Sequence, residues 1–422
     1  MKSIKFMLFS IIIQVFFTGC ASHKSYYEAP LNDVSMISRK VEGDPWRLDE
    51  IPYDGIDNAK PGERPPLDSD EAGLWMVMDQ AEERLSTSGH LIHDEALNRY
   101  LHDIACRLTP EYCEDLRIYV LRVPYFNAAM MPKGAMQIWS GLLVRVQNEA
   151  QLASIIGHEV GHYIRRHSLQ QMQGMINKTS TLVFVQVATA LAGVGIAGDV
   201  ATLITAGSIA AFSRDQEREA DGYGLALLSR AGYDPREAAK VWEQLLEEDK
   251  VSENKRSQPI FLSTHPLPAE RLYALKDLGN RIAAKGADYK TEKARLAENI
   301  LPKQKDWLKD EFYLCDYART EKLLDTLLEN EKSNADLLYL KGELYRLRGK
   351  EGDIDKALSV YENARAAGSP PSEIYRSMGL LYSKSGRTAE AIASFQAYLE
   401  NCADCSDSQM ITHMIEGMKN GK

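Results

Sequence analysis

The segment from His158 to His162 reads His-Glu-Val-Gly-His and constrains the fold and the chemistry more than any other. An α-helix turns by about 100° per residue, so side chains four positions apart lie on one face. On such a helix, His158 and His162 can place two imidazole nitrogens on one metal ion. Zinc lowers the pKa of a bound water to about 7, and Glu159 is placed to take its proton as a general base. The segment therefore predicts a metal-binding helix that activates water; the alternative is a chance match on a charged helix.

The residues around this segment favour a buried helix. Asn148 followed by Gln151 is typical of a helix N-terminus. Apolar residues keep helical spacing through the segment: Leu152, Ile155, Ile156, Tyr163 and Ile164. Arg165 and Ser168 stand where the metzincin pattern requires glycine and histidine, which excludes that class. His167 follows the segment by five residues and points off the metal-binding face, so we predict a surface histidine.

Two carboxylates four residues apart are candidates for completing the metal site. Glu217 and Asp221 share one face of a predicted helix, and apolar residues follow at Leu225, Leu227 and Leu228. This pattern suits a buried role, with Glu217 as the third metal ligand and Asp221 accepting a hydrogen bond from a ligand histidine. Glu219 lies two residues from each and is predicted to point towards solvent. The alternative for the whole stretch is a solvated run of charges.

A family resemblance follows from these two helices together. His158, Glu159 and His162, with Glu217 and Asp221 on a second helix, resemble the gluzincin peptidases of the CAAX-prenyl-protease and HtpX type. The resemblance covers roughly residues 72 to 280. It implies a zincin-like peptidase domain that binds one Zn²⁺ per chain and hydrolyses peptide bonds.

The stretch before the metal helix extends the resemblance. Asn127, Ala128 and Gly134 match the part of the family that forms an edge strand, against which a substrate peptide is laid. An edge strand offers unpaired N–H and C=O groups to an extended peptide, whatever its side chains. This tolerance suits a protease that acts on damaged or misassembled proteins.

The segment around His265 and Pro266 resembles the family's His-Pro segment. In the BepA-like periplasmic branch of the family, the matching histidine can approach the zinc. The resemblance thus implies that His265 closes the open position of the metal as a gate. Alternatively, His265 stabilises the oxyanion that forms at the scissile carbonyl, or caps a turn before Pro266. Arg271 either contacts substrate or braces the domain.

The start of the chain indicates secretion and lipidation. Lys2 and Lys5 precede an apolar run over residues 6–17, which is short for a membrane-spanning helix and typical of a signal peptide. Gly19 and Cys20 then resemble the end of a bacterial lipobox, so we predict that Cys20 is acylated. The alternatives are ordinary cleavage and an uncleaved anchor. Ser22 resembles outer-membrane sorting, which places the expected lipoprotein on the periplasmic face of the outer membrane.

The other cysteines fit an oxidising compartment. Cys106 and Cys113 flank a short loop that a disulfide can close. Cys402 and Cys405 form a CxxC pair, which is predicted to be a small disulfide or two free thiols. Cys315 is left over and can pair with either group.

Length, composition and charge allow two domains and no basic nucleic-acid-binding surface. The chain has 422 residues, of which 44% are hydrophobic, and its formal net charge is −10. We predict a signal peptide over residues 1–19, a lipid-anchored linker over 20–69, a peptidase domain over 70–283 and a helical repeat domain over 284–422. Residues 181–212 are mostly apolar and are expected to form a hairpin that covers the cleft or touches a membrane or a membrane-protein partner. The alternatives are a pair of buried helices and a transmembrane segment.

The last third of the chain repeats itself. Gly342 and Tyr345 recur 37 residues later as Gly379 and Tyr382. A second pattern recurs after 34 residues, from Ala357 and Tyr361 to Ala391 and Phe395. Residues 308–331 look like a degenerate earlier copy. The pattern resembles the tetratricopeptide repeat, whose stacked helices form concave surfaces for peptides and partners.

We therefore predict an α+β, mainly helical protein, with a zincin-like peptidase domain containing a short edge-stranded sheet and then a tetratricopeptide-like helical domain. The expected function is a zinc endopeptidase of the bacterial cell envelope that cleaves misfolded or misassembled envelope proteins, with Glu159 as general base. Its expected partners are polypeptide substrates, envelope or outer-membrane proteins held by the repeats, and the membrane through the anchor. The alternative is a chaperone or assembly scaffold with a gated protease site. A repeat-only adaptor would follow if no metal bound.

Overall fold

A computed structural model describes residues 58–178, 212–253, 261, 265, 269–402 and 405–420. The predicted signal peptide, Cys20, most of the linker and most of the predicted hairpin at 181–212 lie outside these residues. Among the helices that are described, none combines the length and the apolar character needed to cross a membrane.

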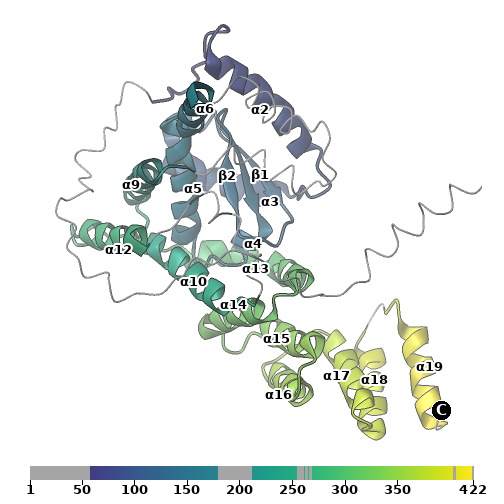
Figure 1. Ribbon diagram of the computed structural model, residues 1–422. Coiled ribbons are helices and arrows are strands. Elements are labelled where there is room, and N and C mark those ends of the chain that lie inside the picture. Colours follow the sequence, from purple (N-terminus) through teal and green to yellow (C-terminus); the bar gives the residue numbers. More distant parts are fainter. Residues whose placement is uncertain are drawn as a thin grey trace, which may run out of the picture. The chain divides into compact units, whose positions relative to one another are not determined.

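Helices dominate the described residues, and the strands form one small sheet (Figure 1). The first part of the chain contains α2 (Asp70–Ser86), α3 (Glu95–Leu108), β1 (Arg117–Leu121), β2 (Ala128–Met130), β3 (Ala135–Trp139), α4 (Ser140–Leu143), α5 (Glu149–Ile164), α6 (His167–Lys178), α9 (Arg214–Arg230), α10 (Glu237–Val251) and α12 (Ala269–Ala283). The second part contains α13 (Lys293–Asp310), α14 (Tyr317–Asn330), α15 (Ala335–Arg348), α16 (Asp353–Ala366), α17 (Glu373–Lys384), α18 (Thr388–Asn401) and α19 (Ser408–Lys419). Short 3₁₀ helices add η3 (Pro110–Tyr112) and η4 (Glu311–Leu314). The predicted fold class, mainly helical α+β followed by helical repeats, is confirmed.

The sheet has the strand order β1-β3-β2, with β1 parallel and β2 antiparallel to β3. Because β2 pairs only with β3 among the described strands, it is an edge strand. The carbonyl of Asn127 accepts from Trp139, and the N–H of Met131 donates to Ala135, so these positions face β3. Side chains alternate in a strand, and so do its hydrogen-bonding groups. The N–H and C=O groups of Ala128 and Met130 therefore face away from β3, on the free edge.

Gly134, predicted to belong to the edge strand, lies instead in the turn between β2 and β3. Its φ of 89° is left-handed, and a Cβ atom there would lie 2.4 Å from the carbonyl oxygen of Asp115. Both observations require glycine. The residue shapes the return from β2 to β3 and is not part of the surface on which a peptide can pair.

The helix that carries the metal motif forms as the sequence predicts. The side chain of Asn148 accepts a hydrogen bond from the N–H of Gln151 at 3.0 Å, which caps α5. Every residue of α5 is buried, including its polar ones. Helix α9 runs close beside α5 (Figure 1). A Cβ atom at Gly224 of α9 would lie 3.0 Å from the backbone nitrogen of His158, so glycine at this contact allows the two helices to approach.

The repeats predicted from the sequence make the same contact twice. In the first copy, a Cβ atom at Gly342 would lie 2.2 Å from the ring of Tyr361, and in the second, one at Gly379 would lie 2.6 Å from Phe395. Gly342 and Gly379 are the pair related by the offset of 37 residues, and Tyr361 and Phe395 are the pair related by the offset of 34. In each copy the glycine of one helix seats the aromatic ring of the next, in the pairs α15–α16 and α17–α18 (Figure 1).

Gly342→Ala is therefore expected to destabilise the repeats. A Cβ atom 2.2 Å from the fully buried Tyr361 ring forces the ring or the helices to shift, and overpacking of this kind costs about 1–3 kcal/mol of unfolding free energy. Denaturant unfolding of the full chain measures the change. Gly73→Ala on α2 is the matched control, because nothing lies within 4 Å of a Cβ atom there, and a helical alanine is up to about 1 kcal/mol better than glycine. Equal midpoints for the two variants would refute the contact.

A buried charge network joins segments on both sides of residue 284, the predicted domain boundary. Arg145, just after α4, donates to Glu248 of α10 at 2.8 Å and to both oxygens of Glu311 in η4 at 2.7 and 3.0 Å. Arg319 of α14 lies 3.6 Å from Glu248. All four side chains are at most 2% exposed. Removing one partner from such a group leaves an uncompensated buried charge.

Candidate metal centre

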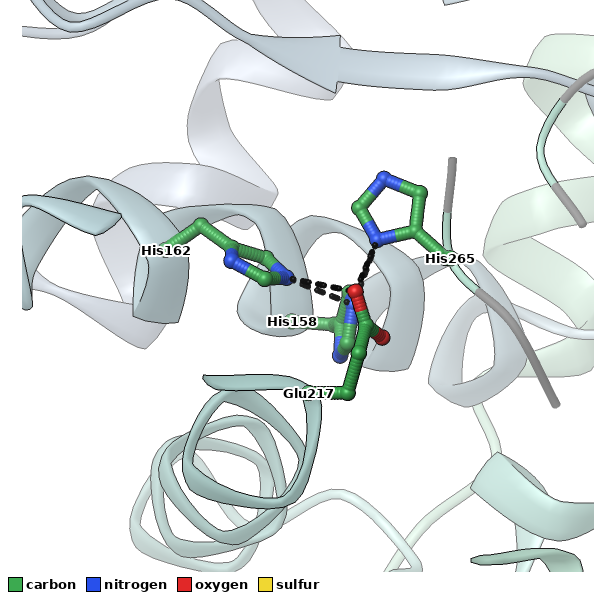
Figure 2. Close-up of side chains that lie close together, drawn as sticks. All are labelled: His158, His162, Glu217 and His265. Atoms are coloured by element: carbon green, nitrogen blue, oxygen red, sulfur yellow. Dashed lines mark hydrogen bonds and ion pairs between the residues drawn. The ribbon is translucent and has the colours of Figure 1, made fainter. Parts of the chain in front are cut away.

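Three separate segments bring four candidate ligands together (Figure 2). His158 and His162 come from one face of α5, Glu217 comes from the first turn of α9, and His265 comes from the segment between α10 and α12. One ligand atom from each of the four lies within 4.8 Å of every other. The structure thus brings the predicted metal residues and the predicted gate to one point.

The arrangement of the three predicted ligands fits a metal ion. The Nε2 atoms of His158 and His162 are 3.1 Å apart, and each lies 3.6 Å from an oxygen of Glu217. Two nitrogens bound at about 2.0–2.1 Å to one tetrahedral ion lie roughly 3.3 Å apart. Outside the cluster, Nδ1 of His158 lies 3.0 Å from Oδ1 of Asp221, and Nδ1 of His162 lies 2.8 Å from Nδ1 of His167. With a hydrogen on each of these Nδ1 atoms, both Nε2 lone pairs point into the cluster. A shared cation satisfies both of them.

Asp221 lies where the sequence predicts, behind a ligand histidine. Its Oδ1 is 3.0 Å from Nδ1 of His158, and Arg271 donates to both of its oxygens at 2.5 and 2.8 Å. The same guanidinium lies 2.5 Å from Oε2 of Glu217, so Arg271 braces the site from behind. Burial raises the pKa of Asp221, but the charge of Arg271 and its hydrogen bonds outweigh this and lower the pKa. Asp221 is therefore a carboxylate that faces Nδ1 of His158, the position expected of a residue that sets the tautomer of a metal-bound histidine.

His167 is not the surface histidine that the sequence predicts. It is fully buried, and its Nδ1 lies 2.8 Å from Nδ1 of His162. The reason is that α5 does not continue: it ends at Ile164, and Arg166 adopts a left-handed φ of 53°. The chain turns there and brings His167 back towards the site. Nothing in the spacing signals this turn, because arginine rarely adopts a left-handed conformation.

Glu219 also differs from its prediction of a solvent-facing side chain. Its Oε2 lies 3.0 Å from Nε2 of His167, and its Oε1 lies 2.7 Å from Nε of Arg165. Its side chain is 28% exposed. Burial raises the pKa of Glu219, but the hydrogen bond from His167 and the charge of Arg165 outweigh it and lower the pKa. Glu219 is thus a carboxylate that pairs with His167 and Arg165, beside the candidate metal centre.

Glu159 connects the metal helix to the edge strand. Its Oε2 accepts a hydrogen bond from the N–H of Met130, on the free edge of β2, at 3.0 Å. Its Oε1 has no hydrogen-bond partner among the described residues and lies 3.5 Å from Nε2 of His265. Burial raises the pKa of the Glu159 carboxyl, which makes it a stronger base than an exposed glutamate. One oxygen is therefore held in place, and the other can take a proton.

His265 is the fourth member of the cluster. Its Nδ1 lies 2.9 Å from Oε1 of Glu217 and 3.3 Å from Nε2 of His158. Burial lowers the pKa of His265, but the carboxylates of Glu217 and Glu159 outweigh it and raise the pKa. His265 therefore lies close to a candidate metal ligand and to the candidate base together, so it is more than a turn cap.

Two aromatic residues that sequence reasoning missed hold the histidine rings. Phe261 stacks on His265 with 4.3 Å between ring centroids, and Phe212 stacks on His162 with 3.9 Å. The centroids of Phe212 and His265 are 5.3 Å apart. The sequence offers one weak signal, because Phe261 precedes His265 by four residues, one helical turn. Phe212 is distant from its partners along the chain and gives no such signal.

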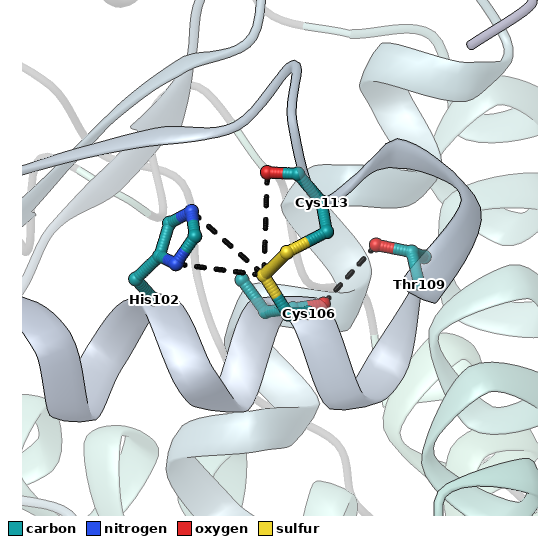
Figure 3. The surroundings of a disulfide bond; sticks show 5 residues. His102, Cys106, Thr109 and Cys113 are labelled. Atoms are coloured by element: carbon teal, nitrogen blue, oxygen red, sulfur yellow. Dashed lines mark hydrogen bonds between the residues drawn. A yellow bond between two sulfur atoms is a disulfide. The ribbon is translucent and has the colours of Figure 1, made fainter.

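The structure contains the disulfide predicted between Cys106 and Cys113 (Figure 3). Cys106 of α3 and Cys113, just after η3, are bonded, and His102 lies one helical turn before Cys106 with its Nδ1 3.5 Å from the sulfur. Cys402 and Cys405 also form a disulfide. Cys315 is not a free thiol either, but it is bonded to none of these four cysteines.

Comparison with known proteins agrees with this geometry. Residues 92–278 match peptidase family M48, and residues 346–404 match the tetratricopeptide repeat. The chain is 25% identical to the beta-barrel assembly-enhancing protease of Escherichia coli K12 over 80% of its own length and 76% of the relative. It is 31% identical to the mitochondrial metalloendopeptidase OMA1 of Schizosaccharomyces pombe, over 38% of this chain and 45% of the relative.

Other relatives are covered less fully. The beta-barrel assembly-enhancing protease of Yersinia pestis is 27% identical over 50% of this chain and 46% of the relative. The chain thus spans only about half the length of several relatives that it matches. The M48 match contains both metal helices and His265. Residues 92–278 therefore carry a peptidase M48 domain, and tetratricopeptide repeats follow it in the same chain.

Proposed function

We propose that the chain is a zinc endopeptidase of the bacterial cell envelope, acting on misfolded or misassembled envelope proteins. The observation that carries the proposal is the convergence of His158, His162 and Glu217 beside a glutamate bonded to an edge strand. Two imidazoles and one carboxylate with a further position for water or substrate are a ligand set typical of catalytic zinc. Bound there, one Zn²⁺ per chain supplies Lewis acidity that activates water and polarises the scissile carbonyl.

The residues of this chain then divide the work. The free edge of β2 offers the N–H and C=O of Ala128, and the C=O of Met130, to an extended peptide. Glu159 accepts a proton from the attacking water at Oε1 and returns it to the leaving amine. Asp221 and Arg271 keep the ligands oriented. Since the main chain of the substrate supplies the pairing, this design accepts many sequences.

His265 is proposed to gate the site. It lies within the ligand cluster and contacts both Glu217 and Glu159, so a substrate carbonyl and His265 compete for the same position. A fourth protein ligand closes a catalytic metal site. The buried state of the ligands favours the second candidate function as well, that of a chaperone or assembly scaffold whose protease opens only on demand.

The location and the partners are inferred from the relatives and the repeats. The bacterial relatives are named beta-barrel assembly-enhancing proteases, and this chain shares their peptidase domain and carries repeats after it. We propose that the repeats select envelope or outer-membrane proteins and that Cys20 anchors the chain at the periplasmic face of the outer membrane. The division into a peptidase domain over 70–283 and a repeat domain over 284–422 is part of this proposal.

Metal content tests the proposed site. The purified full chain without its lipid anchor is expected to hold one zinc ion by elemental analysis. Glu217→Ala is expected to lose it, because the variant removes the one carboxylate among the four candidate ligands and leaves no negative charge in the ligand set. Asp215→Ala is the matched control, since it removes a carboxylate from the same first turn of α9, where the side chain is 91% exposed. Zinc retained by Glu217→Ala, or absent from the wild type, would contradict the ligand assignment.

A further inference from the structure

We propose that Glu219 and His167 act as a relay that positions His162 on the metal. This inference rests on the proposed function, in which His162 is a metal ligand. His167 and Glu219 would be positioning residues, since neither reaches the metal. The relay runs from the Glu219 carboxylate to His167 and from His167 to His162, over 3.0 and 2.8 Å.

The contacts leave one assignment of protons. When His162 is a metal ligand, its Nε2 presents a lone pair to the cluster of candidate ligands. The ring hydrogen of His162 then lies on Nδ1 and is donated to Nδ1 of His167. His167 must then carry its own hydrogen on Nε2, which donates to Oε2 of Glu219. The carboxylate at the end of the relay thus selects the tautomer of both rings. Without it, His167 can present a hydrogen at Nδ1, and His162 loses its acceptor.

The site treats its two histidine ligands differently. His158 faces the carboxylate of Asp221 directly, with 3.0 Å between its Nδ1 and Oδ1, and Arg271 donates to both oxygens of that carboxylate. His162 reaches its carboxylate only through a second imidazole. Such outer partners fix the ring orientation and the basicity of a ligand, and their loss typically costs 10- to 100-fold in metal affinity. Both ligands therefore depend on a carboxylate of α9, but the orientation of His162 also depends on His167, which lies between His162 and its carboxylate.

The surroundings hold the relay in place from two sides. Arg165 pairs with the second oxygen of Glu219 at 2.7 Å and donates to Asn58 at 2.5 Å. The left-handed Arg166, which turns His167 inward, has ion pairs to Glu63 and Glu71, each at 3.2 Å. A strained arginine that is fixed by two carboxylates serves to place the next residue.

Zinc affinity of the full chain tests the relay. Competition with a chromophoric chelator is expected to give a 10- to 100-fold higher Kd for Glu219→Ala than for wild type. Asp215→Ala, which removes a similar charge from the same helix, is expected to match wild type. The thermal midpoint of metal-free Glu219→Ala should stay close to that of the control, because the side chain is partly exposed. The absorption bands of the Co²⁺-loaded chain should also change, since they report ligand geometry.

A second pair of variants separates positioning from packing. His167→Asn keeps an acceptor near the position of Nδ1 and is expected to retain more zinc affinity than His167→Leu. Equal zinc Kd values for Glu219→Ala and Asp215→Ala would overturn the relay while leaving the metal site intact. Zinc that binds to His162→Ala as tightly as to wild type would instead overturn the proposed ligand set, and the relay with it.

Discussion

Glu159→Gln is expected to keep its zinc and to lose peptide hydrolysis by at least about 10²-fold, and up to about 10⁴-fold. The reason is that the amide oxygen of glutamine can still accept the hydrogen bond from Met130, so α5 and β2 stay in register. The amide cannot, however, take a proton from water at neutral pH. Hydrolysis of an unstructured fluorogenic peptide, measured beside zinc content in the same preparation, checks both halves of the expectation.

The control for this variant is Glu243→Gln on α10. Glu243 is a surface glutamate that pairs with Lys276, and its side chain is 40% exposed. This variant is expected to hydrolyse the peptide at the wild-type rate. A Glu159→Gln chain that remained active with full zinc content would show that another group takes the proton. A variant that lost zinc would show that Glu159 is needed to assemble the site.

His265→Ala is expected to raise hydrolysis about tenfold or more and to increase cleavage of the chain by itself. In the wild type, the proposed gate keeps the conformation with an open metal site as a minor state, and minor states are typically populated at about 0.1–10%. Removing the imidazole frees the metal's remaining position and releases Glu159 from a neighbour 3.5 Å away. Self-cleavage on gels and peptide hydrolysis report the change.

Two further variants show whether a change in hydrolysis comes from the loss of the His265 imidazole. His265→Ala combined with Glu159→Gln should show no self-cleavage, which excludes a contaminating protease. His102→Ala removes a histidine beside the Cys106–Cys113 disulfide and should leave the rate unchanged. If His265 instead stabilises the oxyanion, the single variant lowers kcat by about 10²-fold or more. A rate that did not change would leave His265 a structural residue.

The spacing of residues along the sequence predicts the features that are set within a single helix. The cap at Asn148, the shared face of His158 and His162, and the shared face of Glu217 and Asp221 all follow from the helical repeat, and the structure contains each of them. The fold class followed from the same periodicities and the repeat offsets. The strand order did not, because strands of three to five residues carry too little pattern to fix their neighbours.

The wrong predictions share one physical cause, which is a change of chain direction. Continuing α5 past its end predicts a surface position for His167, whereas the left-handed Arg166 turns the chain inward. Helical spacing predicts that Glu219 faces solvent, and it cannot reveal His167 as a partner because that histidine is itself displaced. The family resemblance predicts a strand at Gly134, which forms the turn after that strand. In each case a contact distant in sequence overrides the local period.

The buried network around Arg145 also restricts how this architecture can be recombined. Glu311 and Arg319 stand in the stretch that sequence analysis assigns to the repeats, yet their charges balance those of Arg145 and Glu248. A chimaera joined at residue 284 would separate these four ions and leave the guanidinium of Arg145 buried without one of its carboxylates. The first junction after residue 284 that keeps all four together is the loop between α14 and α15. Any exchange of repeats, in the laboratory or between genomes, must therefore carry α13 and α14 along with the peptidase.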